Sequence, residues 1–224
     1  MRRVAQLGTM PETFRLRDLR VVRRGFLNLL DFQPDDRPYR FDLMERGGAC
    51  AMLPVDWERG LAYLLCAPRH LRAYALLPEG RAAVRRALAE GASPEEIAAP
   101  RDVVVAWGVP AGMIEEGEPP RAAAARELAE ETGLHVAAET FVHVATVFPS
   151  VGGSTEQLHL YLAPLRGPVG ELHPRGDGHE TGEVWELTFR EAFALLDCGQ
   201  ITHASSLILL QHLREDARLR HLTF

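Results

Sequence analysis

One stretch of this chain, residues 112–134, constrains the fold more than any other, and it reads GMIEEGEPPRAAAARELAEETGL. Pro119 and Pro120 fit the first turn of a helix, where the missing N–H group of proline costs nothing. The residues that follow are mostly strong helix formers, and Gly133 suits a left-handed cap that ends a helix. The sequence therefore predicts a helix over about 121–132, preceded by a loop over 112–118.

Three glutamates share one face of this predicted helix, because Glu127, Glu130 and Glu131 are spaced i, i+3 and i+4. Like charges at this spacing repel by roughly 0.2–0.5 kcal/mol per pair on an exposed helix. Carboxylate oxygens on one face suit a hard divalent cation such as Mg²⁺, so the pattern indicates a metal site. The alternative interpretation is a solvated, glutamate-rich surface helix.

Two further residues of the stretch favour the metal site. Arg126 is expected to point away from the three glutamates and to pair with Glu118, which would fix the loop to the helix. Gly112 is expected to allow a backbone geometry that a side chain would forbid.

Written as a pattern, the stretch is G-x5-E-x7-R-E-U-x-E-E-x-G-U, where U is apolar, and it resembles the Nudix hydrolases at every defining position. The resemblance implies an α/β (α+β) fold in which a mixed β-sheet is sandwiched between helices. It implies that Glu127 and Glu131 are primary metal ligands, that Glu130 binds a further ion, and that the carbonyl of Ala111 joins them. Residues 112–134 form the box that defines this family, and its structural residues would be Gly112, Glu118, Arg126 and Gly133. The cofactor would be Mg²⁺, with Mn²⁺ as an alternative.

Composition and net charge limit which other binding partners and cellular settings are expected. The chain has 224 residues and a net charge of −6, so it lacks the basic surface that nucleic-acid binding requires. The three cysteines are far apart and show neither metal-ligand spacing nor a disulfide framework, which favours a reducing, cytoplasmic setting. No apolar run reaches transmembrane length, and the N-terminus does not resemble a signal peptide.

The chain divides into an N-terminal β region over 1–48 and a catalytic domain over 49–224. In the N-terminal region we expect strands over 20–28 and 39–45, separated by a break over 33–37. This order resembles the ADP-ribose pyrophosphatase and sugar-nucleotide branch of the Nudix family, in which such a region often builds a homodimer. A segment over about 76–101 is less familiar and reads as two short helices inserted before a strand.

The attacking water needs a base to accept its proton. In the ADP-ribose branch that base is often a glutamate on a late loop, which here reads RGDGHETGEVWEL and offers Glu180 first and Glu183 second. Three weaker matches suggest substrate contacts in the same branch: Arg69, Pro149 and Glu156.

The resemblance implies a nucleotide as the small-molecule substrate, with ADP-ribose hydrolysed to AMP and ribose 5-phosphate. The alternatives are GDP-mannose or another nucleotide sugar or nucleotide, and a non-catalytic module that binds ADP-ribose as a sensor. Such modules commonly lose carboxylates of the box, whereas this chain keeps them all. The sequence therefore favours an enzyme over a sensor.

Overall fold

The computed structural model describes residues 16–25, 27–34, 38–68, 89, 105–167, 169, 172 and 182–219. The chain forms two compact units, Met1–Gly48 with Phe148–Gln157, and Ala49–Val147 with Leu158–Phe224. The first unit thus takes up residues 148–157, which the sequence placed in the second domain. Backbone hydrogen bonds explain this grouping, because Met44 N–H donates to the Gly153 carbonyl and Thr155 N–H donates to the Met44 carbonyl.

The first unit contains an antiparallel three-stranded sheet of β1 (Leu16–Arg23), β2 (Asn28–Pro34) and β3 (Phe41–Glu45). The expected single strand over 20–28 is wrong, because the chain turns back on itself within it. At this turn the Gly25 N–H donates to Asn28 Oδ1 over 3.4 Å. The expected break at residue 33 is also too early, since β2 continues to Pro34 and pairs there with β1.

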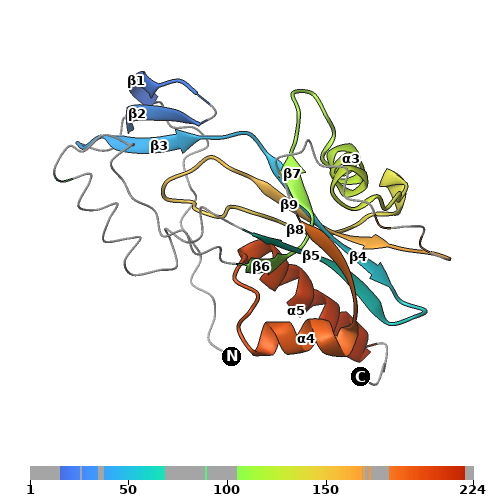
Figure 1. Ribbon diagram of the computed structural model, residues 1–224. Helices are drawn as coiled ribbons and strands as arrows, with labels where there is room; N and C mark the ends of the chain where they lie inside the picture. The colour runs from blue at the N-terminus through green and yellow to red at the C-terminus, as the bar shows by residue number, and fades with distance from the viewer. Residues whose placement is uncertain are drawn as a thin grey trace, which may run out of the picture. The chain divides into compact units, whose positions relative to one another are not determined.

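Among its described residues the second unit is built around a seven-stranded mixed sheet (Figure 1). The strand order is β10-β5-β4-β9-β8, with β6 added to β5 and β7 added to β4. β4 and β9 are parallel, and the other pairs are antiparallel. The strands are β4 (Ala49–Asp56), β5 (Leu61–Pro68), β6 (Val105–Gly108), β7 (Ala111–Met113), β8 (Val142–Val147), β9 (Leu158–Pro164) and β10 (Glu183–Thr188).

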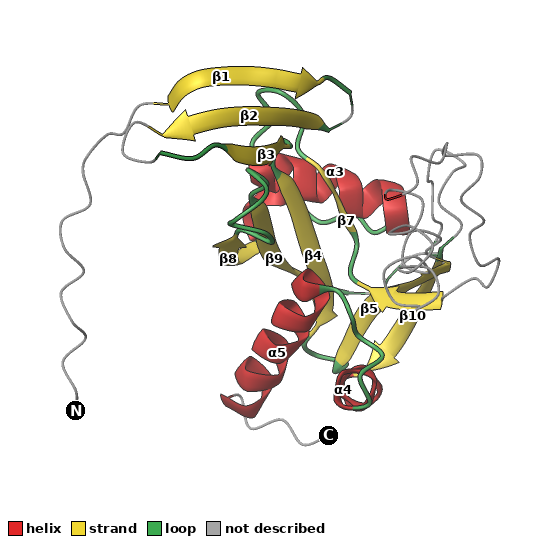
Figure 2. Cartoon of the chain, turned by 90° about the vertical axis from the view of Figure 1, so that its left-hand side faces the viewer, coloured by secondary structure: helices red, strands yellow, loops and turns green. Residues whose placement is uncertain are grey.

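The central strand β4 is buried along its whole length, because both faces of the sheet are covered by helices. Its side chains alternate between two cores: Ala51, Leu53 and Val55 belong to one, and Cys50 and Met52 to the other. α4 (Phe189–Asp197) and α5 (Ala204–Leu219) cover the first core, and α3 (Pro120–Thr132) covers the second (Figure 2). The predicted sheet sandwiched between helices is therefore confirmed.

α3 begins and ends close to where the sequence predicts. Pro120 occupies the first turn of the helix, and Gly133 follows the last residue with a φ of 75°. The Gly133 N–H donates to the Ala129 carbonyl over 3.0 Å, which closes the helix. Ala123, Ala124 and Leu128 are buried on the side of α3 that faces the sheet.

Other expectations differ or lie outside the described residues. The expected strands over 136–147 include only one strand, β8, because residues 138–140 form a 3-10 turn in which Thr140 Oγ1 donates to the Ala137 carbonyl. The expected helical insert over 76–101 lies outside the described residues except for Ala89. No helix in the described part of the chain is long and apolar enough to cross a membrane.

Gly133, which caps the end of α3, is expected to contribute to the stability of the protein. We expect Gly133→Ala to lower the free energy of unfolding by about 1 kcal/mol, because alanine is strained at a positive φ. Urea unfolding followed by circular dichroism measures this loss. Gly152→Ala is the control, because Gly152 lacks a positive φ and has open space around it. An equal loss in both variants would contradict the cap assignment.

Candidate metal centre on helix α3

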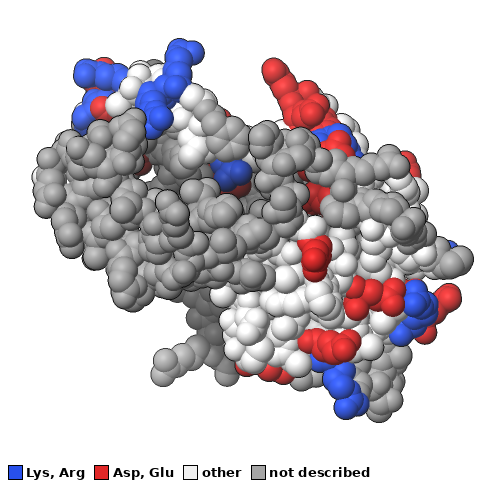
Figure 3. All heavy atoms as spheres, viewed as in Figure 1, with Lys and Arg blue, Asp and Glu red and all other residues white. Residues whose placement is uncertain are grey.

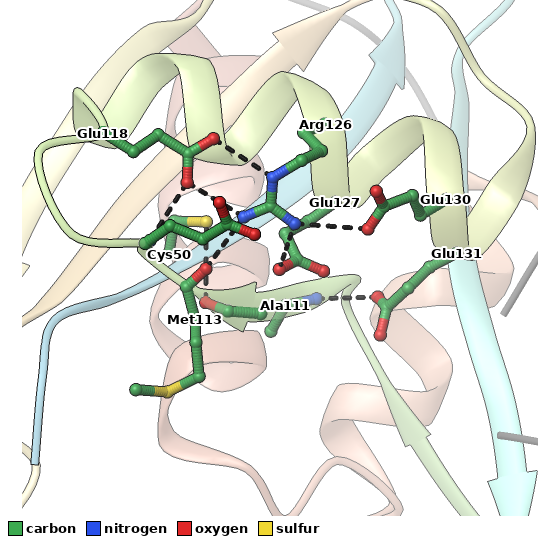
Figure 4. A network of polar contacts seen from close by, with 10 residues as sticks. Cys50, Ala111, Met113, Glu118, Arg126, Glu127, Glu130 and Glu131 are labelled. Carbon is green, nitrogen blue, oxygen red and sulfur yellow. Dashed lines mark hydrogen bonds and ion pairs between the residues drawn. The ribbon is translucent and has the colours of Figure 1, made fainter. Parts of the chain in front are cut away.

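A single guanidinium connects the loop before α3 to the helix and to β7 (Figure 4). Arg126 donates two hydrogen bonds to Glu118, from Nε over 3.1 Å and from Nη2 over 2.9 Å. Nη2 also donates to the Met113 carbonyl over 3.0 Å. The Glu115 N–H donates to Glu118 Oε2 over 3.1 Å, so the carboxylate of Glu118 is held from both sides.

The same guanidinium also contacts the glutamates of the helix, which corrects the expectation that Arg126 points away from them. Its Nη1 donates to Glu127 Oε1 over 2.8 Å and to Glu130 Oε2 over 3.2 Å. Spacing on an ideal helix separates residues 126 and 127 by about 100°, but the long arginine side chain folds back over the helix surface. Arg126 thus offsets the repulsion between these carboxylates.

Gly112 is required for space rather than for a special backbone angle, since its φ is not positive. A Cβ atom at this position would lie 1.9 Å from Cδ of Glu127, and 2.2 Å from each carboxylate oxygen. The Glu127 carboxylate therefore rests directly on the backbone of β7. The sequence expectation named the correct residue but gave the wrong reason.

Glu131 also meets β7, because its Oε2 accepts a hydrogen bond from the Ala111 N–H over 2.8 Å. Glu130 is more open, with half of its side chain exposed. The structure therefore gathers Ala111, Glu127, Glu130 and Glu131 along one side of α3, next to the start of β7 (Figure 4).

The charges in this network shift the pKa values of its members in opposite directions. Hydrogen bonds from Arg126 hold the pKa of Glu118 below its ordinary value. The pKa of Glu127 is raised instead, because partial burial outweighs the attraction of Arg126. The carboxylate hydrogen bonds, first that of Glu118, raise the pKa of Arg126, which therefore stays charged.

Comparison with known proteins identifies the family. A model of the NUDIX domain matches residues 79–207, more than half of the chain. This chain belongs to the Nudix family. It is similar to the ADP-ribose pyrophosphatase of Bacillus subtilis, with 32% identity over 106 residues, which are 47% of this chain and 56% of that protein. It is also similar to the GDP-mannose pyrophosphatase of Cronobacter sakazakii, with 36% identity over 105 residues, 46% of this chain and 53% of that protein.

The chain thus spans about half the length of these two relatives. Among solved structures it resembles a crystal structure of an ADP compounds hydrolase, with a TM-score of 0.61 and 14% identity. That match covers 96% of this chain and 100% of the other chain. At this identity the likeness establishes the fold and nothing further.

The donor set of the Nudix helix fits a divalent cation in its chemistry. Glu127, Glu130 and Glu131 provide only oxygen atoms, which hard ions such as Mg²⁺ prefer. Gly112 leaves room for Glu127 against β7. As the side chains stand, no three acidic, histidine or cysteine residues of the described ranges enclose an ion. Arg126 and the Ala111 N–H donate hydrogen bonds to these carboxylates.

A cysteine that the sequence did not link to the box lies beside this centre. Cys50 is fully buried, and its Sγ donates a weak hydrogen bond to the Gly112 carbonyl over 3.7 Å. Burial raises the pKa of the thiol to about 12, so it stays protonated and is not a nucleophile. Its contact with Gly112 could not be found from spacing, because 62 residues separate the two.

The other expected site residues are not brought to the box by contacts in the described structure. Glu183 is exposed at the start of β10 and lies opposite Cys66 of β5. Glu156 belongs to the first unit, where it forms an ion pair with Arg46 over 3.4 Å, and Pro149 belongs to the same unit. Arg69 and Glu180 lie outside the described residues.

The surface near the box is acidic, as Figure 3 shows over the loop that precedes α3. Glu115 and Glu116 are exposed in this loop. A cavity of about 640 Å³ lies elsewhere, beyond the last residue of α3, and Gly133, Val142 and Arg166 help to line it. None of the four box glutamates lines this cavity, so it is separate from the candidate metal centre.

The bonds of Arg126 predict that lysine cannot replace it. We expect Arg126→Lys to lower the free energy of unfolding by roughly 1–2 kcal/mol, because an ammonium group cannot bond both oxygens of Glu118 in parallel. Urea unfolding measures the change. Arg121→Lys is the matched control, since Arg121 is exposed on the same helix. Equal stability of the two variants would show that the guanidinium network adds nothing.

Proposed function

We propose that this protein is a divalent-metal-dependent hydrolase that cleaves the pyrophosphate bond of a nucleoside diphosphate derivative. The favoured substrate is ADP-ribose, which would yield AMP and ribose 5-phosphate. The observation that carries the proposal is the packing of Glu127 on Gly112, with Glu131 beside it on Ala111. This packing presents an all-oxygen donor set at one edge of β7.

In this proposal Mg²⁺ is held by Glu127, Glu131 and the carbonyl of Ala111, and Glu130 serves a further ion. Bound Mg²⁺ would neutralise charge on the pyrophosphate and lower the pKa of the attacking water. Arg126 keeps the carboxylates in place, and Glu118 fixes Arg126. Glu180 or Glu183 would accept the proton of the attacking water, and Glu180 is the first choice.

The names of the relatives support the substrate class at a coarser level. One relative is named for ADP-ribose and the other for GDP-mannose, and both compounds carry a nucleoside diphosphate. GDP-mannose is therefore the second candidate. The box keeps all of its carboxylates, which supports an enzyme over a sensor module. The wider proposal places the enzyme in the cytoplasm as a homodimer formed through its first unit.

Glu131→Gln tests the metal centre without removing side-chain volume. We expect turnover to fall more than about 100-fold, because a neutral amide loses the charge that holds the cation. Product analysis with Mg²⁺ measures turnover, and circular dichroism checks that the fold is kept. Glu116→Gln is the matched control, since Glu116 is an exposed glutamate of the preceding loop. Activity of Glu131→Gln close to that of the control would refute the assignment.

A substrate panel tests the choice of substrate. We expect ADP-ribose to be cleaved to AMP faster than GDP-mannose, NADH, diadenosine polyphosphates and 8-oxo-dGTP, and EDTA to stop the reaction. Chromatography of the products identifies the bond that is cut. A preference for GDP-mannose would keep the chemistry and replace the substrate. Tight binding of one compound without turnover of any would favour the sensor.

A further inference from the structure

Two tryptophans contact each other at the side of the sheet that α3 does not cover. Trp107 of β6 and Trp185 of β10 meet edge to face, with ring centroids 5.6 Å apart and an interplanar angle of 71°. Trp107 is partly buried against the core beneath α4 and α5. Trp185 remains 45% exposed, although it is one of the largest apolar side chains of the protein. Trp107 therefore contacts the ring of Trp185, and nearly half of the Trp185 side chain is open to solvent.

The strand register places this pair beside Glu183. Cys66 of β5 lies directly opposite Trp107 on one side and Glu183 on the other. Side chains of directly opposed residues share a face of a sheet, and residues two apart on one strand also share a face. Glu183, Trp185 and Trp107 therefore lie on one face, and Glu183 is one of the two proposed bases.

The pair also lies close to the box along the chain. β6 passes through Val109 and Pro110 directly into β7, so Ala111 follows Trp107 by four residues. Four residues span at most about 14 Å when fully extended. The backbone of Trp107 is therefore within about 14 Å of Ala111, which keeps the tryptophan pair near the box.

We propose that Trp185, in edge-to-face contact with Trp107, is the platform on which the nucleobase of the substrate stacks. This inference rests on the proposed function, since it assumes a nucleoside diphosphate at the box. Stacking requires only an aromatic face, so it tolerates different bases. The platform thus selects compounds that carry a base, favours purines for their larger face, and discriminates weakly between adenine and guanine.

The kinetic test compares variants of Trp185. We expect Trp185→Ala to raise KM for ADP-ribose about tenfold with kcat changed little, in line with the loss of one stacked base. Trp185→Phe should restore most of the affinity, because it keeps an aromatic face. The control is Trp57→Phe, since Trp57 packs against Phe189 in the core and is distant from Glu183 in the strand register. A merely structural Trp185 would instead lower stability and kcat while leaving KM unchanged.

A binding test separates this proposal from the proposed function. The chain has three tryptophans, so a Trp57→Phe protein reports only Trp107 and Trp185 by fluorescence. We expect AMP to quench this signal, ribose 5-phosphate to leave it unchanged, and the additional change Trp185→Phe to abolish the response to AMP. This test needs no turnover, so it holds even if no compound of the panel is hydrolysed. Turnover of ADP-ribose with an unchanged KM in Trp185→Ala, and no quenching by AMP, would overturn the platform and leave the hydrolase standing.

Discussion

The candidate site depends on one guanidinium group, that of Arg126, which lies among the glutamate carboxylates of the box. Arg126 bonds Glu118 in the loop, the Met113 carbonyl in β7, and Glu127 and Glu130 on its own helix. Without it, several negative charges would face one another on α3 and along its loop, with no attraction to offset their repulsion. Because Arg126 is partly buried, water screens these bonds less than it would screen those of an exposed pair. The guanidinium therefore offsets only part of the charge, because the box holds four carboxylates, those of Glu118, Glu127, Glu130 and Glu131.

The sheet of the second unit carries a different candidate site on each of its two faces. On one face α3 brings its glutamates to β7, and on the other the two tryptophans stand beside α4 and α5. β4 and β5 pair with each other only near their hairpin, at Val55–Ala62 and Asp56–Leu61. Farther from the hairpin, β4 pairs with β7 and β5 pairs with β6. The short link between β6 and β7 thus connects the candidate metal centre to the proposed base platform.

This separation of tasks explains why the family is easier to establish than the substrate. In the proposed function the carboxylates hold the cation that acts on the pyrophosphate, which all the candidate substrates share. A stacking surface recognises that a base is present and reads little of its identity. Relatives named for ADP-ribose and for GDP-mannose are consistent with such a division, since their names differ in both the base and the sugar.

The sequence by itself determined the family, the length of α3 and the identity of its glutamates, because helix periodicity and capping are local properties. Tertiary structure decided why Gly112 must be glycine, since only packing places Glu127 on β7. It also decided that Arg126 folds back to the helix glutamates, and that Trp107, Cys66 and Glu183 form one row across three strands. These contacts depend on strand register and side-chain packing between distant segments, which no local pattern in the sequence encodes.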